Sequence, residues 1–296
     1  MRAQSASKNQ IRWLEKYAMP YLFIAVPLLS FTVFLLIPML VSFWWSLNDY
    51  SGIQPPRFIG LQNYVELFTS DRYFIKALWN TTVFVVLGMS IGPTLGLATA
   101  LLLNQKVRFQ SLFRTAYYLP VMTSLVVVST IWVMLYNQNG LFNTILTSLG
   151  LKPVGWLSNP NIALFSVAIA SIWQGFGFET VIFLAALQSI PRELYEAAMM
   201  DGANAWQRFR AVTLPALRYV IGFVYIYGVI GSYQVFDQVF VMTSGGPIHS
   251  TTTVVYHLFS KFQDLRLGYA SAIAYVLFAI LMLFSYIEIR ISRAKE

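Results

Sequence analysis

Between two long apolar runs, the sequence reads ELYEAAMMDGANAWQRFRAVTLPAL from Glu193 to Leu217. The acidic residues fall in its first half and the basic residues in its second half, and Gly202 divides the two. The flanking runs, 162–187 and 219–242, are each long enough to cross a bilayer as a helix, which takes about 20 apolar residues. A regular charged segment between two such runs needs an explanation. The first step is to establish from the composition which class of protein this is.

The composition is that of a membrane protein. Apolar types make up 57% of the 296 residues and charged types 11%, whereas soluble domains carry roughly 25% charged residues. Runs of about 20 residues without repeated charges therefore predict an all-α polytopic protein with six transmembrane helices. Their expected ranges are 21–45, 80–103, 116–136, 162–187, 219–242 and 269–289.

The lysines and arginines fall mainly on one side of these helices. Of the 20, 14 lie in the N-terminal segment 1–20, the second connection, the charged segment 189–217 with its flanks, and the tail 290–296. Basic flanks stay on the cytoplasmic side, so both termini and segment 189–217 are expected there. The first apolar run is too long for a cleaved signal peptide and is expected to stay as an anchor. The range 21–289 is then one six-helix domain.

Several chemistries have no basis in the sequence. There is no Gly-Lys dipeptide and hence no phosphate-binding P-loop for ATP hydrolysis. Cysteine is absent, and the two histidines, His249 and His257, are expected in a loop rather than at a metal. The net charge of +8 follows from the cytoplasmic excess, so nucleic acid is not an expected partner. The chain is expected to hold no metal and no cofactor, and not to be an enzyme.

A pattern in the second apolar run has two interpretations. Gly88-Met89-Ser90-Ile91-Gly92 matches the G-x-S-x-G nucleophile elbow, which would make the chain an intramembrane hydrolase that uses Ser90. That motif needs a strand-to-helix turn and a base in reach, and neither is expected here. Gly88, Gly92 and Gly96 recur every four residues and predict a small-residue stripe for close helix packing.

Segment 189–217 is predicted to form two short helices that are separated at Gly202. We expect the first to be capped by Ser189, with Pro191 in its first turn and its end near Met200, and the second to run from Asn204 to about Thr213, before Pro215.

One face of the first helix is small, with Leu194, Ala197, Ala198 and Asp201 on it. A shallow face with charges at its rim suits docking against another protein. A helix lying on the membrane surface is the alternative, because Trp206 and Phe209 could insert while Arg208 and Arg210 meet lipid phosphates.

The order of residues in this segment resembles a known family. Glu193, Glu196-Ala197-Ala198, Asp201-Gly202-Ala203, Phe209 and Pro215 match the E-A-A-x-x-D-G-A loop of permease subunits in binding-protein-dependent ABC importers. The resemblance implies that these residues form a coupling element seated in a cleft of a separate ATPase subunit, which binds the ATP and Mg. The family often has a proline where this chain has Tyr219.

Further motifs resemble the carbohydrate importers of that family, in particular the first permease of maltose and glycerol-phosphate systems. They are Phe236-Asp237, Thr243-Ser244-Gly245-Gly246-Pro247 and Thr251-Thr252-Thr253. The resemblance implies the six-helix, MetI-like fold of type I importers in a bacterial inner membrane. It also implies four kinds of partner besides lipid: a second, homologous permease, two ATPase subunits, an outer solute-binding protein and a sugar.

Polar residues within the apolar runs are candidates for the path of that solute, because such residues usually face a cavity or the bundle interior. They are Trp173, Gln174 and Glu179 in the fourth run, and Tyr225, Tyr227, Ser232, Tyr233, Gln234 and Asp237 in the fifth. Sugars present hydroxyl groups and apolar C–H faces, which suits amides, carboxylates and rings together. No lysine or arginine is expected at mid-membrane, which argues against a strongly anionic cargo. A different class of protein, an ion-coupled secondary transporter, would use Glu179 and Asp237 as relay groups.

Overall fold

The computed structural model describes residues 19–105 and 109–293, and these residues are mostly helical. The expected N-terminal segment 1–20 and the end of the tail lie almost wholly outside this range. In chain order the elements are α2 (Met19–Phe31), the π-helix η2 (Thr32–Leu36), α3 (Ile37–Ser46), β1 (Asn48–Asp49), β2 (Arg57–Phe58), α4 (Gln62–Thr69), α5 (Arg72–Leu103), α6 (Gln110–Met122), α7 (Leu125–Leu135), α8 (Leu141–Ser148), α9 (Ala163–Gln188), α10 (Arg192–Met200), α11 (Ala205–Arg208), the π-helix η3 (Phe209–Thr213), α12 (Leu214–Ala216), α13 (Arg218–Tyr233), α14 (Asp237–Met242), α15 (Val254–Gln263) and α16 (Leu267–Arg293).

Four of the predicted transmembrane helices are single helices in the described residues. They are Tyr21–Ser46, Arg72–Leu103, Ala163–Gln188 and Leu267–Arg290. The second begins about two turns earlier than the hydropathy predicts, because Asp71 caps it through the backbone N–H groups of Tyr73 and Phe74.

The third predicted helix, 116–136, is not continuous. α6 and α7 meet at an angle of 100°, and the turn consists of Thr123 and Ser124, whose ψ angles of 141° and 133° are extended. The two parts pack on different neighbours, since α6 lies on α9 and α7 lies on α14. Hydropathy along the sequence does not reveal this change of direction, because the two turn residues have short side chains and the run remains apolar.

The fifth predicted helix, 219–242, is also wrong as a single span. α13 ends at Tyr233, and α14 begins after a break at residues 234–236. Val235 at this break is buried, and its carbonyl accepts a hydrogen bond from Thr253 Oγ1 at 3.0 Å. The break is stable within the bundle because a side chain replaces the helical hydrogen bond that it gives up.

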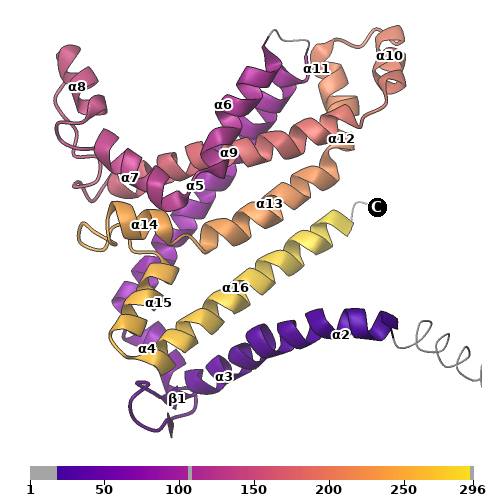
Figure 1. Cartoon of the computed structure of the whole chain (residues 1–296). Coiled ribbons are helices and arrows are strands. Elements are labelled where there is room, and N and C mark those ends of the chain that lie inside the picture. The colour runs from indigo at the N-terminus through magenta and orange to yellow at the C-terminus, as the bar shows by residue number, and fades with distance from the viewer. Residues whose placement is uncertain (1–18, 106–108, 294–296) are drawn as a thin grey trace, which may run out of the picture.

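Helices α5 and α9 pack along each other at the centre of the molecule (Figure 1). Gly92 and Gly96 of α5 are buried there, and a Cβ atom added at Gly96 would lie 2.8 Å from Glu179 Cβ. Gly88 faces a different neighbour, since its added Cβ would lie 3.5 Å from Ser232 Oγ of α13. The predicted stripe is thus a contact with two helices rather than with one.

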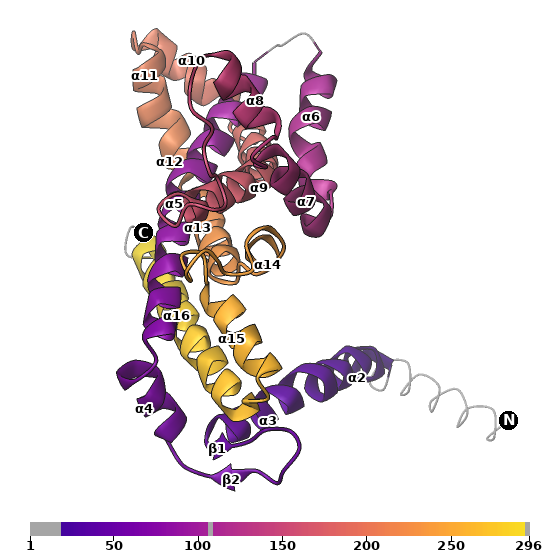
Figure 2. The ribbon, with the colours of Figure 1, turned by 90° about the vertical axis from the view of Figure 1, so that its left-hand side faces the viewer.

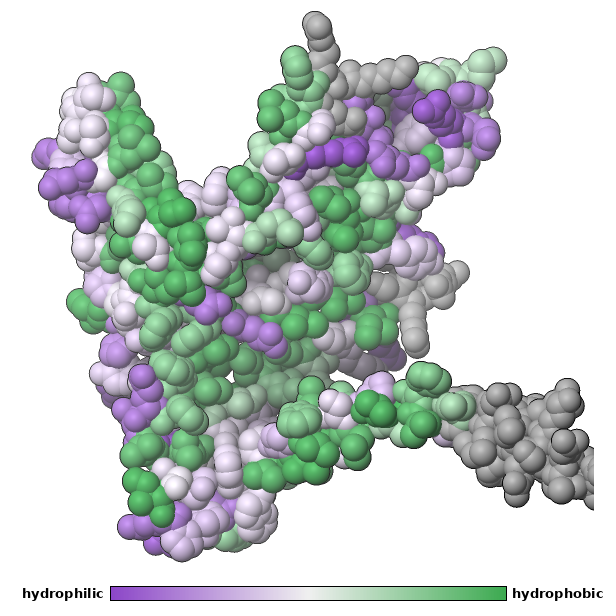
Figure 3. All heavy atoms as spheres, viewed as in Figure 1, coloured by the Kyte–Doolittle hydropathy of each residue, from purple (hydrophilic) through white to green (hydrophobic). Residues whose placement is uncertain are grey.

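The two ends of the molecule differ in what they carry. In Figure 1, α10, α11, the C-terminal end of α16 and the N-terminal end of α2 lie toward one side, and α4, β1, α8, α14 and α15 lie toward the other. Figure 2 shows α2 reaching away from the other helices. None of the most apolar 18-residue window of the span Tyr21–Ser46, which includes most of α2, is buried. Figure 3 shows apolar residues over much of the visible face, which is hollowed between α8 and α6.

At the end that holds α4 and α15, one carboxylate joins three helices. Besides capping α5 through Oδ1, Asp71 accepts hydrogen bonds at Oδ2 from His257 Nε2 of α15 and the Tyr269 hydroxyl of α16, each at 2.8 Å. Burial raises the pKa of the Asp71 carboxyl, but these hydrogen bonds outweigh burial and the pKa lies below its ordinary value. The loop expected for His257 is therefore wrong, since this ring is buried in a helix.

Candidate functional site

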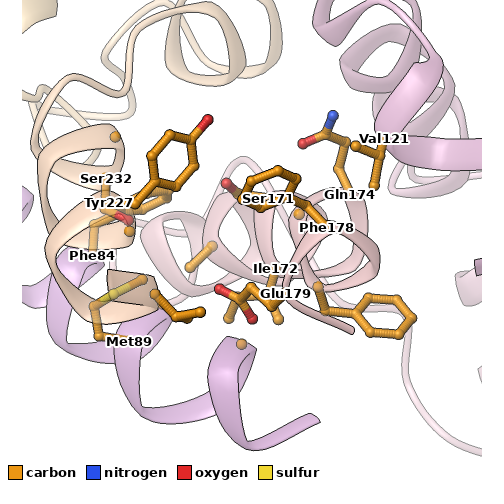
Figure 4. Close-up of a pocket in the computed structure, with 18 of the residues that line it drawn as sticks. Phe84, Met89, Val121, Ser171, Ile172, Gln174, Phe178, Glu179, Tyr227 and Ser232 are labelled. Atoms are coloured by element: carbon orange, nitrogen blue, oxygen red, sulfur yellow. The ribbon is translucent and has the colours of Figure 1, made fainter. Parts of the chain in front are cut away.

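A cavity of about 410 Å³ lies among α5, α9 and α13, with α6, α7 and α14 at its edge. Figure 4 shows the side chains that line it, which include Phe84, Met89, Val121, Ser171, Ile172, Gln174, Phe178, Glu179, Tyr227 and Ser232. Rings, hydroxyl groups, two amides and one carboxyl group therefore line the same space. This is the mixture that a solute with hydroxyl groups and apolar C–H faces requires.

Helical periodicity decides which α9 residues reach the cavity. Ser171, Gly175, Phe178 and Glu179 are spaced by three or four residues and form one face of the helix. Gln174 lies at the edge of this face, and its Nε2 donates to the carbonyl of Pro120 in α6 at 3.4 Å. The sequence analysis missed Ser171, although its spacing from Gln174 and Glu179 could have identified it.

Trp173 lies off this face. Its ring packs edge-on against Trp132 of α7, with the ring centroids 5.7 Å apart, and its side chain is not part of the cavity lining. A large amphipathic ring in an apolar run is therefore a poor guide to the lining of this cavity, because aromatic side chains also form the contacts between helices.

Helical spacing also separates the candidate residues in α13 that line the cavity from those that do not. Tyr227, Gly228, Gly231 and Ser232 line the cavity, and the rings of Tyr227 and Phe178 lie 5.1 Å apart. Tyr225 points instead toward α16, where it lies near Phe284 and Glu288.

Tyr233 is also absent from the lining. It is buried against α16, with its ring 5.4 Å from that of Phe284. Its hydroxyl lies 3.4 Å from Thr82 Oγ1 of α5. These contacts make Tyr233 part of the packing between α5, α13 and α16.

Gln234 and Asp237 line a second, adjoining cavity of about 160 Å³. It shares Ser171, Ser232 and Gln238 with the first cavity. The break between α13 and α14 thus brings these two polar residues beside the main cavity, at a place where the sequence predicted one continuous helix, 219–242.

The carboxyl group of Glu179 is held against α5. Its Oε2 is buried and has no hydrogen-bond partner among the described residues. A Cβ atom added at Gly92 would lie 3.0 Å from Oε2 and 3.1 Å from Oε1. The glycine therefore leaves just enough space for the carboxyl group between the two helices.

The charged connection forms the second part of the site. α10 is followed by a turn at Gly202, whose φ of +77° is a conformation that favours glycine. Asn204 caps α11 in a capping box, in which its side chain accepts from Gln207 N and the Gln207 side chain accepts from Asn204 N. The break and the start of the second helix agree with the predicted positions.

Two predicted details of the connection are wrong. Ser189 does not cap α10, because its hydroxyl donates to the carbonyl of Ala186 in α9 at 2.8 Å. The second helix does not end before Pro215, which lies inside α12. The helix continues through η3 and α12, and the chain bends by 64° only between α12 and α13, beside Tyr219.

The connection has an exposed face on α10 and a buried residue, Leu217, at its C-terminal end. Glu193, Glu196 and Ala197 on α10 and Asp201 in the turn are exposed, whereas Ala198, Ala203 and Phe209 are half-buried. At the base, Leu217 is fully buried in a cluster with residues of α5, α9 and α13.

A hydrogen bond joins the two halves of the connection, since the Tyr195 hydroxyl lies 2.9 Å from Thr213 Oγ1. A force applied to α10 would therefore reach α13, whose other residues line the cavity.

The comparison with known protein families identifies the family to which the chain belongs. The family described as "Binding-protein-dependent transport system inner membrane component" matches residues 92–289, which is more than half of the chain. The matched range contains the helical connection and most of the cavity. The chain belongs to this family. It is thus a component of a binding-protein-dependent transport system, a multi-pass membrane protein from a family of transport components rather than of enzymes.

Curated relatives in this family align along nearly the whole chain. The trehalose/maltose transport system permease protein MalF of Thermococcus litoralis is 35% identical over 278 residues, which cover 93% of this chain and 94% of that protein. The lactose transport system permease protein LacF of Rhizobium radiobacter is 36% identical over 284 residues, with 93% and 94% covered. The resemblance to carbohydrate permeases in the sequence is therefore confirmed.

Solved structures agree on the fold of this transport component. A bacterial ABC transporter involved in the import of the acidic polysaccharide alginate matches with a TM-score of 0.84 at 24% identity, covering 97% of this chain and 99% of that chain. A bacterial alginate ABC transporter in complex with an alginate pentasaccharide-bound periplasmic protein gives a TM-score of 0.85 at 24% identity. The predicted all-α, MetI-like permease fold is confirmed by these matches, with two of its spans bent.

Proposed function

We propose that this chain is one transmembrane permease subunit of an ABC importer that moves an oligosaccharide, or a related polyol or glycoside, into the cell. The observation that carries the proposal is the connection between two features. An exposed helical pair with the E-A-A-x-x-D-G-A motif is fixed, through buried Leu217 and the Tyr195–Thr213 hydrogen bond, to the helix whose side chains line a polar and aromatic cavity.

The partners follow from what the chain lacks and what it exposes. It has no P-loop, so a pair of separate ATPase subunits would bind ATP and Mg and receive the α10 face in a cleft. The visible face of Figure 3 is largely apolar and is hollowed between α8 and α6, which suits a second, homologous permease that supplies the other half of the path.

The opposite end of the molecule suits a solute-binding protein outside the membrane. The loop 243–253 is fixed to α5 there, because Asn80 Nδ2 donates to the carbonyls of His249 and Thr252, each at 3.0 Å. Both termini and the charged connection would be cytoplasmic in a bacterial inner membrane. The basic residues are concentrated on that side.

The transport cycle would be alternating access. Closure of the ATPase pair moves α10 and α11, the connection transmits this motion to α13, and the helices that line the cavity open it alternately to the outside and the inside. No step in this cycle needs a catalytic residue in the chain itself, and Ser90 is exposed on α5 with its carbonyl bonded to Thr94 Oγ1.

An ion-coupled secondary transporter is the second candidate, and the buried carboxyl group of Glu179 is the observation in its favour. A secondary transporter of this kind does not require a charged helical pair outside the membrane. Uptake that persists in vesicles without ATP, but with a proton gradient, would support this candidate over the ABC importer.

The test is to disturb the exposed face without touching the cavity. Ala197→Trp adds a bulky ring on α10, and Gly202→Val puts a branched side chain at a φ of +77°. Both variants should lose the co-purifying ATPase subunit and reduce ATP-dependent uptake by at least about tenfold, which corresponds to about 1.4 kcal/mol of lost interaction. Ser148→Trp, on exposed α8 at the other end, is the matched control. Normal uptake and normal ATPase binding in both variants would refute the proposal.

A further inference from the structure

The two helices of the charged connection carry net charges of opposite sign. The acidic residues lie on α10 or in the turn that follows it, where Arg192 is the one basic residue, and they are Glu193, Glu196 and Asp201. After Gly202 the chain has no acidic residue before Asp237, and its basic residues in that range are Arg208, Arg210 and Arg218. Docking of α10 on an ATPase subunit gives no reason for the basic second half.

The second helix of the connection lies along the membrane surface. It runs from Ala205 to Ala216 through α11, η3 and α12, and it bends by 64° from α13. At 1.5 Å per residue this helix is about 18 Å long, so at that angle its far end lies only about 8 Å further out along the axis of α13. The headgroup layer on each side of a bilayer is about 5–8 Å thick. Because α13 is the spanning helix, the segment Ala205–Ala216 stays close to the headgroups (Figure 1).

The start of α13 marks the level of that surface. Tyr219 is exposed, and the guanidinium of Arg218 lies over its ring, 4.4 Å from the ring centroid. Aromatic and basic residues together are typical of the cytoplasmic end of a transmembrane helix. Leu214 therefore lies about one turn of helix from the membrane boundary.

One side of the helix Ala205–Ala216 is held by the protein and another is exposed. Thr213 is buried, and its hydroxyl lies 2.9 Å from that of Tyr195 on α10. Trp206, Arg210 and Leu214 are spaced by four residues and share a face. All three are exposed, with 67% of Trp206 accessible, and Arg210 forms no ion pair with any described residue.

We propose that this face of the helix Ala205–Ala216 docks on the inner leaflet and binds anionic phospholipid. Arg210 contacts a lipid phosphate, and Trp206 and Leu214 insert beside the upper parts of the acyl chains. The proposal rests on the cytoplasmic placement of the connection in the proposed function. It adds a lipid partner to the one helix of the connection that carries only basic charges.

The three side chains have the chemistry that this partner requires. A tryptophan ring is amphipathic and favours the membrane interface, and a leucine beside it adds apolar area for insertion. An arginine at such a position lays its aliphatic stem along the apolar side chains while its guanidinium reaches a phosphate. Anionic lipids of the cytoplasmic leaflet attract basic residues near the surface. The acidic α10 remains free for a protein partner.

The experiment uses the complete transporter in lipid nanodiscs. Because the chain has no cysteine, Ala211→Cys gives a single site for a bimane fluorophore on the exposed side of the helix. Acyl-brominated phosphatidylglycerol or phosphatidylcholine then quenches the fluorophore where lipid touches it. Met200→Cys on α10, at a residue that is 88% exposed, is the matched control for a label in water.

Lipid should quench the label at Ala211→Cys and leave the label at Met200→Cys almost unquenched. Quenching at Ala211→Cys should be stronger with brominated phosphatidylglycerol than with brominated phosphatidylcholine. Adding Arg210→Gln should lower this preference about fivefold, which is the contribution of one basic residue near an anionic surface, whereas Arg210→Lys should keep it. Lys152→Gln, which removes an exposed positive charge at the other end of the molecule, should also keep it.

Trp206→Gln should weaken quenching by both lipids, because it removes the inserted ring. If Arg210→Gln does not assemble, raising the salt concentration replaces it, since screening should reduce the preference for phosphatidylglycerol.

Quenching at Ala211→Cys that is no stronger than at Met200→Cys would overturn the proposal. Aqueous iodide then identifies the true surroundings, because it quenches a label in water and not one covered by the ATPase subunit. A preference for phosphatidylglycerol that survives both Arg210→Gln and high salt would overturn it as well. Failure of the proposed function would look different, namely an ATPase subunit that does not bind and uptake that is independent of ATP.

Discussion

Asp71 joins three helices at the end of the molecule opposite the charged helical pair. Both oxygens of its carboxylate are occupied, one by two backbone N–H groups of α5 and the other by His257 and Tyr269. Only 10% of the side chain is exposed. A single residue therefore fixes the start of α5 relative to α15 and α16.

Asp71→Ala should lower the free energy of unfolding by about 3 kcal/mol. The variant loses a helix cap, which contributes about 1 kcal/mol, and leaves buried donors on His257 and Tyr269 without a partner. Thermal unfolding of the purified complex measures the effect. Asp49→Ala is the control, because it removes an exposed ion pair with Arg57 and should change the stability by less than about 1 kcal/mol.

His257 should make the stability of this junction depend on pH. Burial lowers the pKa of the ring, opposed by the hydrogen bond and the charge of Asp71 and assisted by Lys261 and His249. The unfolded chain therefore takes up this proton at a higher pH than the folded chain. The contribution of neutral His257 is fully present above about pH 6.5, the ordinary pKa of histidine, and is lost as the pH falls through the lower pKa of the folded state.

The measurement is the midpoint of thermal unfolding of the complex between pH 8 and pH 5. His257→Gln should flatten the decline below about pH 6.5, whereas His249→Gln, at the exposed side of the loop, should keep it. A decline of equal size in the wild type and in His257→Gln would contradict this assignment. The lowered pKa of Asp71 acts in the same direction, but only near and below the ordinary carboxyl range.

At the residue scale, the sequence predicted which polar and aromatic residues lie in the apolar runs, but not which of their side chains point into the cavity. Gln174 and Glu179 line the cavity and Trp173, Tyr225 and Tyr233 do not, although all five are polar or amphipathic residues in apolar runs. The residues that line the cavity and those that do not point to different sides of their helices. Once one cavity residue is known, the others on the same side follow from their spacing of three or four residues. Ser171 could have been found in this way.

At the scale of helices, the contact between α5 and α9 depends on Gly96. An added Cβ atom would lie 2.8 Å from Glu179 Cβ and 3.2 Å from the backbone nitrogen of Thr180, and neither is the flexible end of a side chain. Gly96→Ala should therefore force the helices apart and cost about 1–3 kcal/mol.

The readout is the thermal stability and the yield of the assembled complex. Gly231→Ala on α13 is a matched control, since open space surrounds its added Cβ atom and a helical alanine is favoured over glycine. Stability equal to wild type in Gly96→Ala would show that the close approach of the two helices is not required.

The bends in the third and fifth spans were beyond the reach of hydropathy. The turn at Thr123 and Ser124 lies in a pair of helices that together are apolar enough for one span, and the break after Tyr233 lies in the run 219–242, which carries no repeated charge. What stabilises them is tertiary: the packing of α6 on α9, and the hydrogen bond from Thr253 to the carbonyl of Val235. The turn at Gly202 was predictable because glycine itself favours a positive φ.

For the whole molecule, the absence of cysteine allows a direct test of orientation. Gln54→Cys and Ser148→Cys should react with a membrane-impermeant maleimide in intact cells with a permeabilised outer envelope. Ala205→Cys on α11, in cells without the ATPase subunit, should react only after the inner membrane is opened. The unmodified chain should not react at all. Reaction of Ala205→Cys from the outside would reverse the proposed orientation.

The family was evident from the sequence, because a long ordered motif identifies it, whereas four of the six predicted spans are single helices in the described residues. The cavity was not evident, since it arises where α5, α9 and α13 meet and only the candidates in the last two helices had been named. The α5 side of the site, with Phe84 and Met89, has no polar residue that would mark it in an apolar run.

The exposed helix at the start of the chain has a consequence for how the protein is made. The most apolar window of Tyr21–Ser46 is not buried by any later part of the chain, and contacts to α16 begin only toward its end, as between Phe43 and Tyr275. This segment precedes the other described helices in the chain and needs none of them in order to settle in the lipid. Insertion can therefore begin, and be complete for this segment, while most of the polypeptide is still being translated.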